Sequence, residues 1–303
     1  MNELNPTYLT EMKNQHSENL HDFSTMEIIQ VMNQEDKKVA SVVEKALPQI
    51  AAAIDRITKA LEGGGRLFYI GAGTSGRLGV LDASECPPTF GVPGSLVNGL
   101  IAGGEQAIRY PIENAEDDEK AGEDAVVGQL TSQDVLVGIA SSGRTPYVLG
   151  AIKKAKSLGI PTVGISCNTG SELCQLSDFP IEVPVGPEVV TGSTRLKAGT
   201  AQKMVLNMIT TAVMIKLGKV YQNLMVNVQA TNEKLRNRSI SIICDITGAD
   251  EDTARKMNLK ANGDTRVAIL MILYGVSVRE AEEAIQASNG HFPKAVRALA
   301  KGK

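Results

Sequence analysis

One stretch constrains the fold of this chain more than any other, because an apolar strand pattern passes directly into glycines and hydroxyls and then into a helical pattern. Its sequence is Arg66-Leu-Phe-Tyr-Ile-Gly-Ala-Gly-Thr-Ser-Gly-Arg77. A helix that begins where a strand ends has unpaired amide N–H groups and the positive end of its dipole there, and both favour an anion. Gly73 and Gly76 allow close backbone approach, Thr74 and Ser75 add hydroxyl donors, and Arg77 adds a positive charge. The stretch therefore predicts a phosphate-binding loop.

The letters from Gly71 to Gly76 also fit the G-x-G-x-x-G dinucleotide motif. That motif is supported by an acidic residue about 20 positions later, which binds the ribose. No Asp or Glu occurs between Cys86 and Gly104, and adjacent hydroxyls followed by Arg77 suit a terminal phosphomonoester better than a buried pyrophosphate. We therefore expect a sugar phosphate or a similar monoester. A dinucleotide and a strand–helix turn without a ligand are the alternatives.

Composition and charge argue against several other classes of function. The 303 residues carry a net charge of −3 without a long basic run, which argues against a nucleic-acid partner. The start, Met1-Asn-Glu-Leu-Asn, has neither the basic nor the apolar region of an export signal, so we expect a cytoplasmic location. The apolar segment 201–219 is interrupted by Gln202, Lys203 and Asn207. We therefore expect a buried core helix there and no membrane partner.

Metal and disulfide chemistry are also not expected. The four cysteines form no C-x-x-C pair, and the three histidines lie near the two ends of the chain. A zinc site needs its ligands at short spacings. We therefore expect reduced cysteines that pack as small apolar side chains, no metal and no cofactor.

The N-terminal part predicts an arm followed by helices. Residues 1–22 are polar and aperiodic, which indicates an arm that is either disordered or bound to a neighbouring subunit. Ser24-Thr-Met-Glu27 is a capping box at the start of a short helix. A longer helix is expected from about Asp36 to Leu61, with a kink at Pro48 and an end at Gly63-Gly-Gly65.

From Arg66 onward, short apolar runs alternate with helical segments. This alternation is typical of an α/β fold in which a mostly parallel sheet is covered by helices on both faces, a three-layer α/β/α sandwich. The expected strands are Leu67–Ile70, Ser95–Ala102, Val135–Ala140, Thr162–Cys167 and Phe179–Val183.

The third expected strand ends in the same way as the first. Phe68-Tyr-Ile-Gly-Ala-Gly-Thr-Ser-Gly-Arg77 aligns without a gap with Val135-Leu-Val-Gly-Ile-Ala-Ser-Ser-Gly-Arg144. Ligands of open α/β sheets bind beyond the carboxyl ends of the strands, so both hydroxyl-rich loops can face one pocket. The candidate binding residues of the second loop are Ser141, Ser142, Gly143 and Arg144.

A third polar segment opens the long apolar helix and has the sequence Glu188-Val-Val-Thr-Gly-Ser-Thr-Arg-Leu-Lys-Ala-Gly-Thr200. Hydroxyls and cations again gather at a helix N-terminus, which suits an anion. Capping of the helix by Ser193 or Thr194 explains the same pattern equally well.

Composition shifts near Arg236, and three parts of the chain are expected. Residues 1–62 form the arm and helices that pack on the core, 63–236 the α/β domain, and 237–303 a small helical domain for packing or oligomerisation. The last part contains the capping box Ser277-Val-Arg-Glu280. Its expected breaks are Gly248, Asn262-Gly263, Gly275 and Asn289-Gly290.

Two acidic segments lie between the two hydroxyl-rich loops. Glu85 is followed by Pro87 and Pro88, which should end a helix just after it. Glu116 belongs to the acidic run Glu113-Asn-Ala-Glu-Asp-Asp-Glu119. A carboxylate of either kind is more often a solvated surface group, and composition alone makes neither catalytic.

Six motifs in order carry a resemblance to a known family. They are Gly71-Ala-Gly-Thr-Ser-Gly-Arg-Leu-Gly79, Leu81-Asp-Ala-Ser-Glu-Cys-Pro-Pro88, Leu100-Ile-Ala-Gly-Gly104, Ser142-Gly-Arg-Thr-Pro-Tyr-Val148, Glu188-Val-Val-Thr-Gly-Ser193 and Ala230-Thr-Asn-Glu-Lys-Leu235. The chain resembles the sugar isomerase (SIS) domain and, more closely and over almost its whole length, the N-acetylmuramic acid 6-phosphate etherase family. Asn114 departs from this family, where glycine is expected in many members. It affects the loop before Glu116 and not the carboxylate.

The resemblance implies a fold and an activity. The fold is an SIS-type sandwich with a small UBA-like helical domain at the C-terminus. The activity is cleavage of the D-lactyl ether of N-acetylmuramic acid 6-phosphate to N-acetylglucosamine 6-phosphate and D-lactate, by elimination of lactate and addition of water, in the recycling of cell-wall amino sugars. A sugar-phosphate isomerase and a non-catalytic sugar-phosphate sensor of SIS type are the alternatives.

The resemblance also implies residue roles. Glu85 is expected to protonate the departing lactate and then to activate water, and Glu116 is expected to remove the proton at C2. Arg77 and Arg144 either add charge to the site or pair with Asp82 or another acid. A homodimer is expected, because SIS-type sites commonly borrow residues from a partner subunit. Residues expected to hold the phosphate and hydroxyls are Thr74, Ser75, Ser141, Ser142 and Thr145, with Glu188 and Lys197 as weaker candidates.

Overall fold

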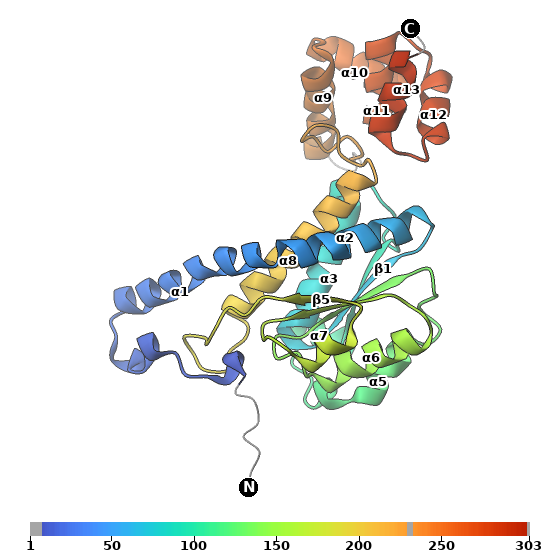
Figure 1. Ribbon diagram of the computed structural model, residues 1–303. Coiled ribbons are helices and arrows are strands. Elements are labelled where there is room, and N and C mark those ends of the chain that lie inside the picture. The colour runs from blue at the N-terminus through green and yellow to red at the C-terminus, as the bar shows by residue number, and fades with distance from the viewer. Residues whose placement is uncertain (1–7, 229–232, 302–303) are drawn as a thin grey trace. The chain divides into compact units, whose positions relative to one another are not determined.

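The computed structural model describes residues 8–228 and 233–301, and its α/β part is built on a five-stranded sheet (Figure 1). The order of the strands is β2-β1-β3-β4-β5, and every pair is parallel. The five predicted strands are confirmed within two residues at each end. They are β1 (Leu67–Gly71), β2 (Val97–Ile101), β3 (Val135–Ile139), β4 (Thr162–Ser166) and β5 (Phe179–Glu182).

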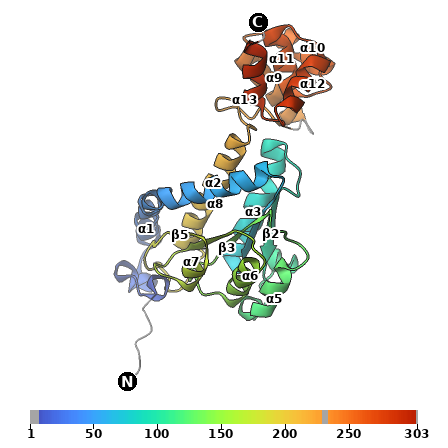
Figure 2. The same ribbon diagram turned by 45° about the vertical axis from the view of Figure 1, so that its right-hand side comes forward.

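Helices cover both faces of the sheet, as the two views show (Figures 1 and 2). One face carries α5 (Glu119–Val126), α6 (Pro146–Ser157) and α7 (Glu172–Leu176), and Phe68 and Ile70 of β1 point into this core. The other face carries α2 (Leu47–Glu62), α3 (Gly73–Phe90) and α8 (Lys197–Lys216). Side chains alternate along a strand, so Tyr69 points to this second face, where its hydroxyl contacts Asp82 of α3 at 3.0 Å. The predicted three-layer sandwich is confirmed.

The N-terminal helices divide differently from the prediction. α1 (Thr25–Lys45) begins at the predicted capping box of Ser24 and Glu27 and continues without a break past Asp36. α2 then begins at Leu47, with Pro48 in its first turn. Proline is tolerated in a first turn because the amides there have no acceptor within the helix. Pro48 therefore lies at a helix start instead of kinking a longer helix.

α3 runs past its predicted end. It continues through Pro87 and Pro88 to Phe90, so the prediction that these prolines end the helix just after Glu85 is wrong. A proline removes an amide donor but keeps its carbonyl acceptor, and the Pro87 carbonyl accepts from the amide of Gly91 at 2.9 Å. The buried side chains of Cys86 and Phe90 hold the last turn in place on both sides of the prolines.

The described part of the N-terminal arm is ordered and docks on its own chain, so the alternative of disorder is wrong for residues 8–22, while binding to a neighbouring subunit stays a prediction. It contains the 3₁₀ helices Leu9–Glu11, Gln15–Ser17 and Leu20–Asp22. Asn14 Nδ2 donates to the Pro187 carbonyl at 3.1 Å, and Ser17 Oγ donates to the Val189 carbonyl at 2.8 Å. Two unpaired carbonyls of the loop before α8 are thereby satisfied. The rest of the arm, residues 1–7, lies outside the described residues.

The chain forms two compact units, and the boundary between them falls within α3 and α8. The first unit comprises the described residues of Met1–Ser84 and Ser95–Thr210, and the second comprises Glu85–Gly94 and the described residues of Thr211–Lys303. The predicted division into 1–62, 63–236 and 237–303 stays a prediction. Of the motif 230–235, residues 230–232 lie outside the described residues.

The second unit is helical. Its core contains Ile243, Leu270 and Phe292. Each predicted break is confirmed, because Gly248, Asn262, Gly263, Gly275, Asn289 and Gly290 all have positive φ, as helix-ending residues often do. The helices are α9 (Glu233–Thr247), α10 (Glu251–Lys260), α11 (Thr265–Tyr274), α12 (Val278–Ala287) and α13 (Phe292–Lys301).

Candidate functional site

A cavity of about 540 Å³ lies in the first unit, where β1 and β3 end. The two strands are neighbours, with Gly71 paired to Ile139, so the loops that follow them meet. Both predicted hydroxyl-rich loops line this one cavity, together with parts of the arm, of the Glu116 segment and of the loop before α8. The lining residues are Glu11, Ala72, Gly73, Thr74, Ser75, Glu116, Asp117, Ser141, Ser142, Arg144, Thr145, Pro146, Gly192 and Thr194.

The first loop supplies Gly73, Thr74 and Ser75, which form the first turn of α3. Gly73 has a φ of 52°, in the left-handed region that favours glycine. The amides of a first helical turn have no acceptor within the helix. They are therefore available to an anion in the cavity, where the helix dipole adds a favourable field.

Gly76 and Arg77 lie behind this loop and do not line the cavity. A Cβ at Gly76 would lie 2.6 Å from Cγ1 of Ile101, so glycine is needed for close packing. Arg77 Nε donates to the carbonyl of Ile108 at 3.0 Å, at the end of the short helix α4 (Gln106–Arg109). These contacts support the loop from behind. A direct part for either residue in ligand binding stays a prediction.

The second loop supplies Ser141, Ser142 and Thr145, and α6 begins directly after it with Pro146. Proline has no amide hydrogen of its own, and the Val148 amide in this turn donates to the Thr145 carbonyl at 3.0 Å. Gly143 does not line the cavity but fixes the turn. Its φ is 71° and a Cβ there would lie 2.3 Å from Cβ of Ser171. Glycine is therefore needed at position 143 for two reasons, the positive φ and the close approach of Ser171.

Arg144 lines the cavity and faces the N-terminal arm. Its guanidinium carbon lies 4.3 Å from the centre of the Tyr8 ring, and its Nη2 lies 3.8 Å from Oε1 of Glu11. Both charged side chains are about half exposed, so this ion pair is weak. A phosphate in the cavity could therefore compete with Glu11 for Arg144.

Asn168 joins the arm to the second loop. It is 2% exposed, its Nδ2 donates to the Ser141 carbonyl at 3.1 Å and to Thr10 Oγ1 at 3.2 Å, and its Oδ1 accepts from the Thr10 amide. A buried amide with donors and acceptor all satisfied holds both segments firmly. One buried side chain thus links the arm to the second loop.

Glu116 is an exposed residue in the 3₁₀ helix η4 (Ala115–Asp117), and it reaches the cavity together with Asp117. The helix is preceded by Asn114, whose φ is 61°. Asparagine is one of the few residues apart from glycine that tolerate this left-handed conformation. The departure from the expected glycine at this position therefore preserves the turn that positions Glu116.

Glu85 lies on α3 within the second unit and is exposed. The described lining of the cavity does not include it. Its predicted part as an acid and base stays a prediction.

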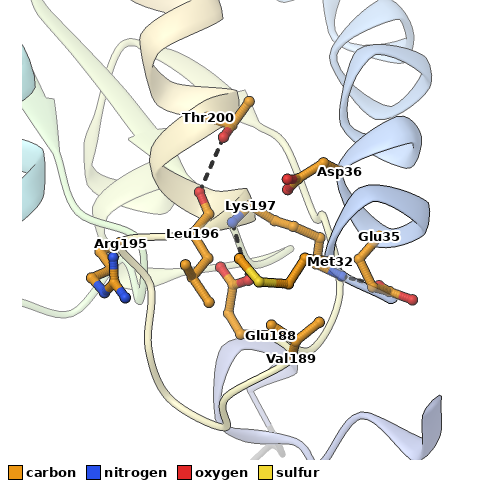
Figure 3. Close-up of a pocket in the computed structure, with 9 residues that line it drawn as sticks. All are labelled: Met32, Glu35, Asp36, Glu188, Val189, Arg195, Leu196, Lys197 and Thr200. Carbon is orange, nitrogen blue, oxygen red and sulfur yellow. Dashed lines mark hydrogen bonds and ion pairs between the residues drawn. The ribbon is translucent and has the colours of Figure 1, made fainter. Parts of the chain in front are cut away.

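Glu188 and Lys197 line a second, smaller cavity of about 190 Å³ between α1 and the start of α8 (Figure 3). Glu188 Oε2 accepts from the Lys197 amide at 3.0 Å and Oε1 from the Ala198 amide at 2.9 Å. Glu188 is thus the capping group of α8. Of the two alternatives for this segment, the anion site or a cap, the cap is confirmed, but Glu188 provides it instead of Ser193 or Thr194. A carboxylate already occupies this helix end, so its amides are not free for a phosphate.

The side chain of Lys197 points to Glu35 of α1, and the two form a buried ion pair with Nζ and Oε2 2.5 Å apart (Figure 3). Burial disfavours the charged form of Glu35, but hydrogen bonds from Lys197 and Lys38 outweigh this effect and lower its pKa to about 2. The pair fixes the start of α8 against α1. The predicted contact of Glu188 and Lys197 with a ligand stays a prediction.

Sequence reasoning missed two groups at the main cavity. Glu11 belongs to the arm that is expected to be disordered or bound to a neighbouring subunit, and nothing local to its sequence indicates that it lines a cavity of its own chain. Gln202 interrupts an apolar helix in the sequence, and in the structure it hydrogen-bonds to Ser75 and Ser141. A polar residue within an apolar helical face must find partners once buried, and that reasoning could have identified Gln202.

Residues 8–228 and 233–301 contain no cluster of three or more His, Cys, Asp or Glu side chains able to hold a metal ion. Within the same ranges, no helix is long and apolar enough to cross a membrane.

Comparison with known proteins gives the class first. The family model of the glucokinase regulatory protein N-terminal SIS domain matches residues 49–156, and the SIS domain model matches residues 106–212. A solved Bacteroides fragilis structure assigned as a phosphosugar isomerase involved in capsule formation shares the fold. It is 20% identical, covers 66% of this chain and 95% of its own, and has a TM-score of 0.50. The fold and the paired loops thus define an SIS-domain protein.

Curated relatives give the particular family. N-acetylmuramic acid 6-phosphate etherase of Pectobacterium atrosepticum is 53% identical over 96% of both chains. The protein of the same name from Halalkalibacterium halodurans is 53% identical over 96% of this chain and 98% of its own. The chain belongs to the N-acetylmuramic acid 6-phosphate etherase family.

Proposed function

We propose that the chain cleaves the D-lactyl ether of N-acetylmuramic acid 6-phosphate to N-acetylglucosamine 6-phosphate and D-lactate, in the recycling of cell-wall amino sugars. The observation that carries this proposal is the near-full-length similarity to etherases at 53% identity. The cavity is consistent with it, because two hydroxyl-rich loops and a carboxylate residue, Glu116, line one space.

The chemistry explains why carboxylates are needed. An ether is a poor leaving group, so direct displacement by water is slow. When the sugar ring opens, the C1 aldehyde acidifies the proton at C2. A base can remove that proton, lactate then leaves from C3 with help from an acid, and water adds to the resulting unsaturated aldehyde at C3. Each acid or base group typically contributes about 10²–10⁴-fold.

Glu116 is the proposed base at C2, because it is the family-predicted carboxylate that reaches the cavity. Glu85 is the proposed acid for the departing lactate and the base for the incoming water. In this scheme the reaction consists of proton transfers, loss of lactate and addition of water, and no step requires a metal or a redox cofactor.

The phosphate is proposed to bind between the two loops. Thr74, Ser75, Ser141, Ser142 and Thr145 line the cavity with hydroxyls, and the first turn of α3 provides amides without helical acceptors. Arg144 adds a positive charge from the same wall. Glu188 and Lys197 are proposed to act through the loop between them, which places Gly192 and Thr194 in the wall.

A homodimer and a cytoplasmic location belong to the same proposal. The first turns of α1 expose Met26 and Ile29, at 59% and 51%, and an apolar surface of this kind suits a second copy of the chain. All four cysteines are free, as is usual in a reducing compartment. Light scattering tests the dimer, and a monomer at micromolar concentration would contradict it.

Lactate release from N-acetylmuramic acid 6-phosphate tests the catalytic assignment. The parent chain should release D-lactate, and Glu116→Gln and Glu85→Gln should each slow release by about 10²–10⁴-fold. Asp117→Asn is the matched control, since it removes a neighbouring carboxylate from the same wall. Folded Glu variants that release lactate at the parental rate would refute the assignment. Tight binding without lactate release by the parent would indicate a sensor, and aldose–ketose interconversion an isomerase.

A further inference from the structure

Gln202 is a polar side chain of α8 that lies behind the main cavity, and its exposed fraction is 0%. Its Oε1 accepts a hydrogen bond from the Ser75 hydroxyl, and its Nε2 donates one to Ser141 Oγ, both at 2.9 Å. Ser75 belongs to the first loop and Ser141 to the second, and both line the cavity. One side-chain amide therefore connects the two loops.

Because of this connection, Ser75 and Ser141 differ in the hydrogen bonds that they can offer to a ligand. A hydroxyl has one hydrogen and two lone pairs. Ser75 uses its hydrogen on Gln202, so its hydroxyl presents only lone pairs to the cavity. Ser141 accepts from Gln202, so its own hydrogen remains available to a ligand.

Another group beside Ser141 is the thiol of Cys167. Burial raises the pKa of Cys167, so the thiol is neutral, and it donates to the Ala198 carbonyl at 3.8 Å. Sulfur is a weak acceptor, whereas a phosphate oxygen accepts a strong, charge-assisted hydrogen bond. A phosphate in the cavity therefore takes the Ser141 hydrogen in preference to the thiol.

We propose that Gln202 is a positioning residue that fixes the direction of these hydrogen bonds, so that Ser141 donates to the phosphate and Ser75 accepts from a sugar hydroxyl. The inference rests on the proposed function in one respect, that the ligand is a sugar phosphate. It gives the two similar loops different tasks. The Ser141 hydroxyl of the second loop donates to the phosphate. The first loop binds the phosphate with its backbone amides, and its Ser75 hydroxyl accepts from a hydroxyl of the sugar.

Titration calorimetry with inorganic phosphate separates the two serines. Ser141→Ala should weaken phosphate binding roughly tenfold, the usual effect of losing one hydrogen bond to a charged group. Ser75→Ala should change it less than about twofold, because its hydroxyl does not donate to phosphate. With N-acetylglucosamine 6-phosphate, both variants should bind more weakly. Equal losses of phosphate affinity in the two variants would overturn the proposal.

Gln202→Met then tests whether Gln202 is the cause. Methionine has a similar volume but neither donor nor strong acceptor, so both hydroxyls become free to rotate toward phosphate. In the Gln202→Met background, Ser75→Ala and Ser141→Ala should weaken phosphate binding to a similar extent. A residue that only held the loops together would leave the difference between the serines unchanged, and that result would refute the proposal.

The single serine variants decide the question even if Gln202→Met does not fold, which its melting temperature reports. Lactate release by the parent chain separates a failure of the proposed function from a failure of the proposed role of Gln202. A parent that binds no phosphate and releases no lactate refutes the proposed function and the proposal together. A parent that does both, with equal serine effects, refutes only the role of Gln202.

Discussion

Replacing Lys197 with methionine tests how the site is held together. The side chains of Lys197 and Glu35 are 2% and 5% exposed, so the ion pair is shielded from water. Removing one partner of a buried pair leaves the other charge uncompensated, which typically costs about 3–5 kcal/mol. Methionine fills most of the space of the lysine, so the loss of packing is small.

The pKa of Glu35 gives a second route to the magnitude. A pKa lowered from 4.5 to about 2 corresponds to about 3 kcal/mol of stability at neutral pH, at about 1.4 kcal/mol per pKa unit. The folded pKa is below the unfolded one, so this stability is present above pH 4.5 and is lost as the pH falls toward 2. Lys38 keeps part of it in the variant. We therefore expect Lys197→Met to cost about 2–3 kcal/mol at pH 7.

Thermal unfolding followed by calorimetry measures this cost. A unit of this size should lose about 2–4 °C per kcal/mol, so the melting temperature should fall by about 4–12 °C at pH 7. The gap between parent and variant should narrow from pH 5 to pH 3. Lys153→Met is the control, because its ion pair with Glu119 is nearly half exposed and should cost less than about 1 kcal/mol. A gap below 1 kcal/mol at pH 7, or one independent of pH, would refute the reasoning.

Two further predictions concern the turns around the main cavity. Gly143→Ala should lower the melting temperature and abolish phosphate binding, because position 143 has a φ of 71° and a Cβ there would lie 2.3 Å from Cβ of Ser171. Gly170→Ala is the control, because position 170 has a similar φ of 62° but open space around a Cβ. That variant should cost only about 1–2 kcal/mol of stability and retain phosphate binding. Equal effects of the two would show that the close approach does not matter. Asn114→Gly should keep the rate of lactate release within about twofold of the parent's, because glycine also adopts the left-handed conformation. Asn114→Val should slow lactate release, because valine disfavours this conformation and Glu116 would be displaced. A rate for Asn114→Val equal to the parent's would contradict this explanation of the turn.

The strands could be predicted from the sequence because each is encoded by the residues of its own short segment. The apolar runs at 67–71 and 135–139 are short, are followed by small residues and alternate with helical segments, and this combination favours parallel strands. The alignment of the two hydroxyl-rich loops then placed Ser75 and Ser141 at one edge of the sheet. Their common cavity follows from the adjacency of β1 and β3.

Features that depend on distant contacts could not be predicted in this way. Pro87 and Pro88 are ordinary helix terminators, and α3 stays helical beyond them where Cys86 and Phe90 are buried and the Pro87 carbonyl accepts from the Gly91 amide. The arm lacks periodicity, and its order comes from hydrogen bonds across more than 150 residues, such as that from Thr10 to Asn168. Tertiary structure overrides local preference at both places.

Glu188 shows why a segment that resembles a phosphate-binding loop in sequence need not have free amides. Its segment contains hydroxyls and cations at a helix start, as the phosphate loops do, yet the amides of that start are capped by Glu188 itself. A helix N-terminus is a phosphate site only if no side chain of the protein already satisfies it. The sequence contains the carboxylate but does not show that it folds back onto the helix.

The most direct test of the proposed elimination is to run the reaction in heavy water and to follow D-lactate and the deuterium content at C2 of the sugar product. Proton removal at C2 followed by return of a solvent proton predicts one deuterium at C2 for each lactate released. Lactate released without deuterium at C2 would contradict the elimination and indicate direct displacement.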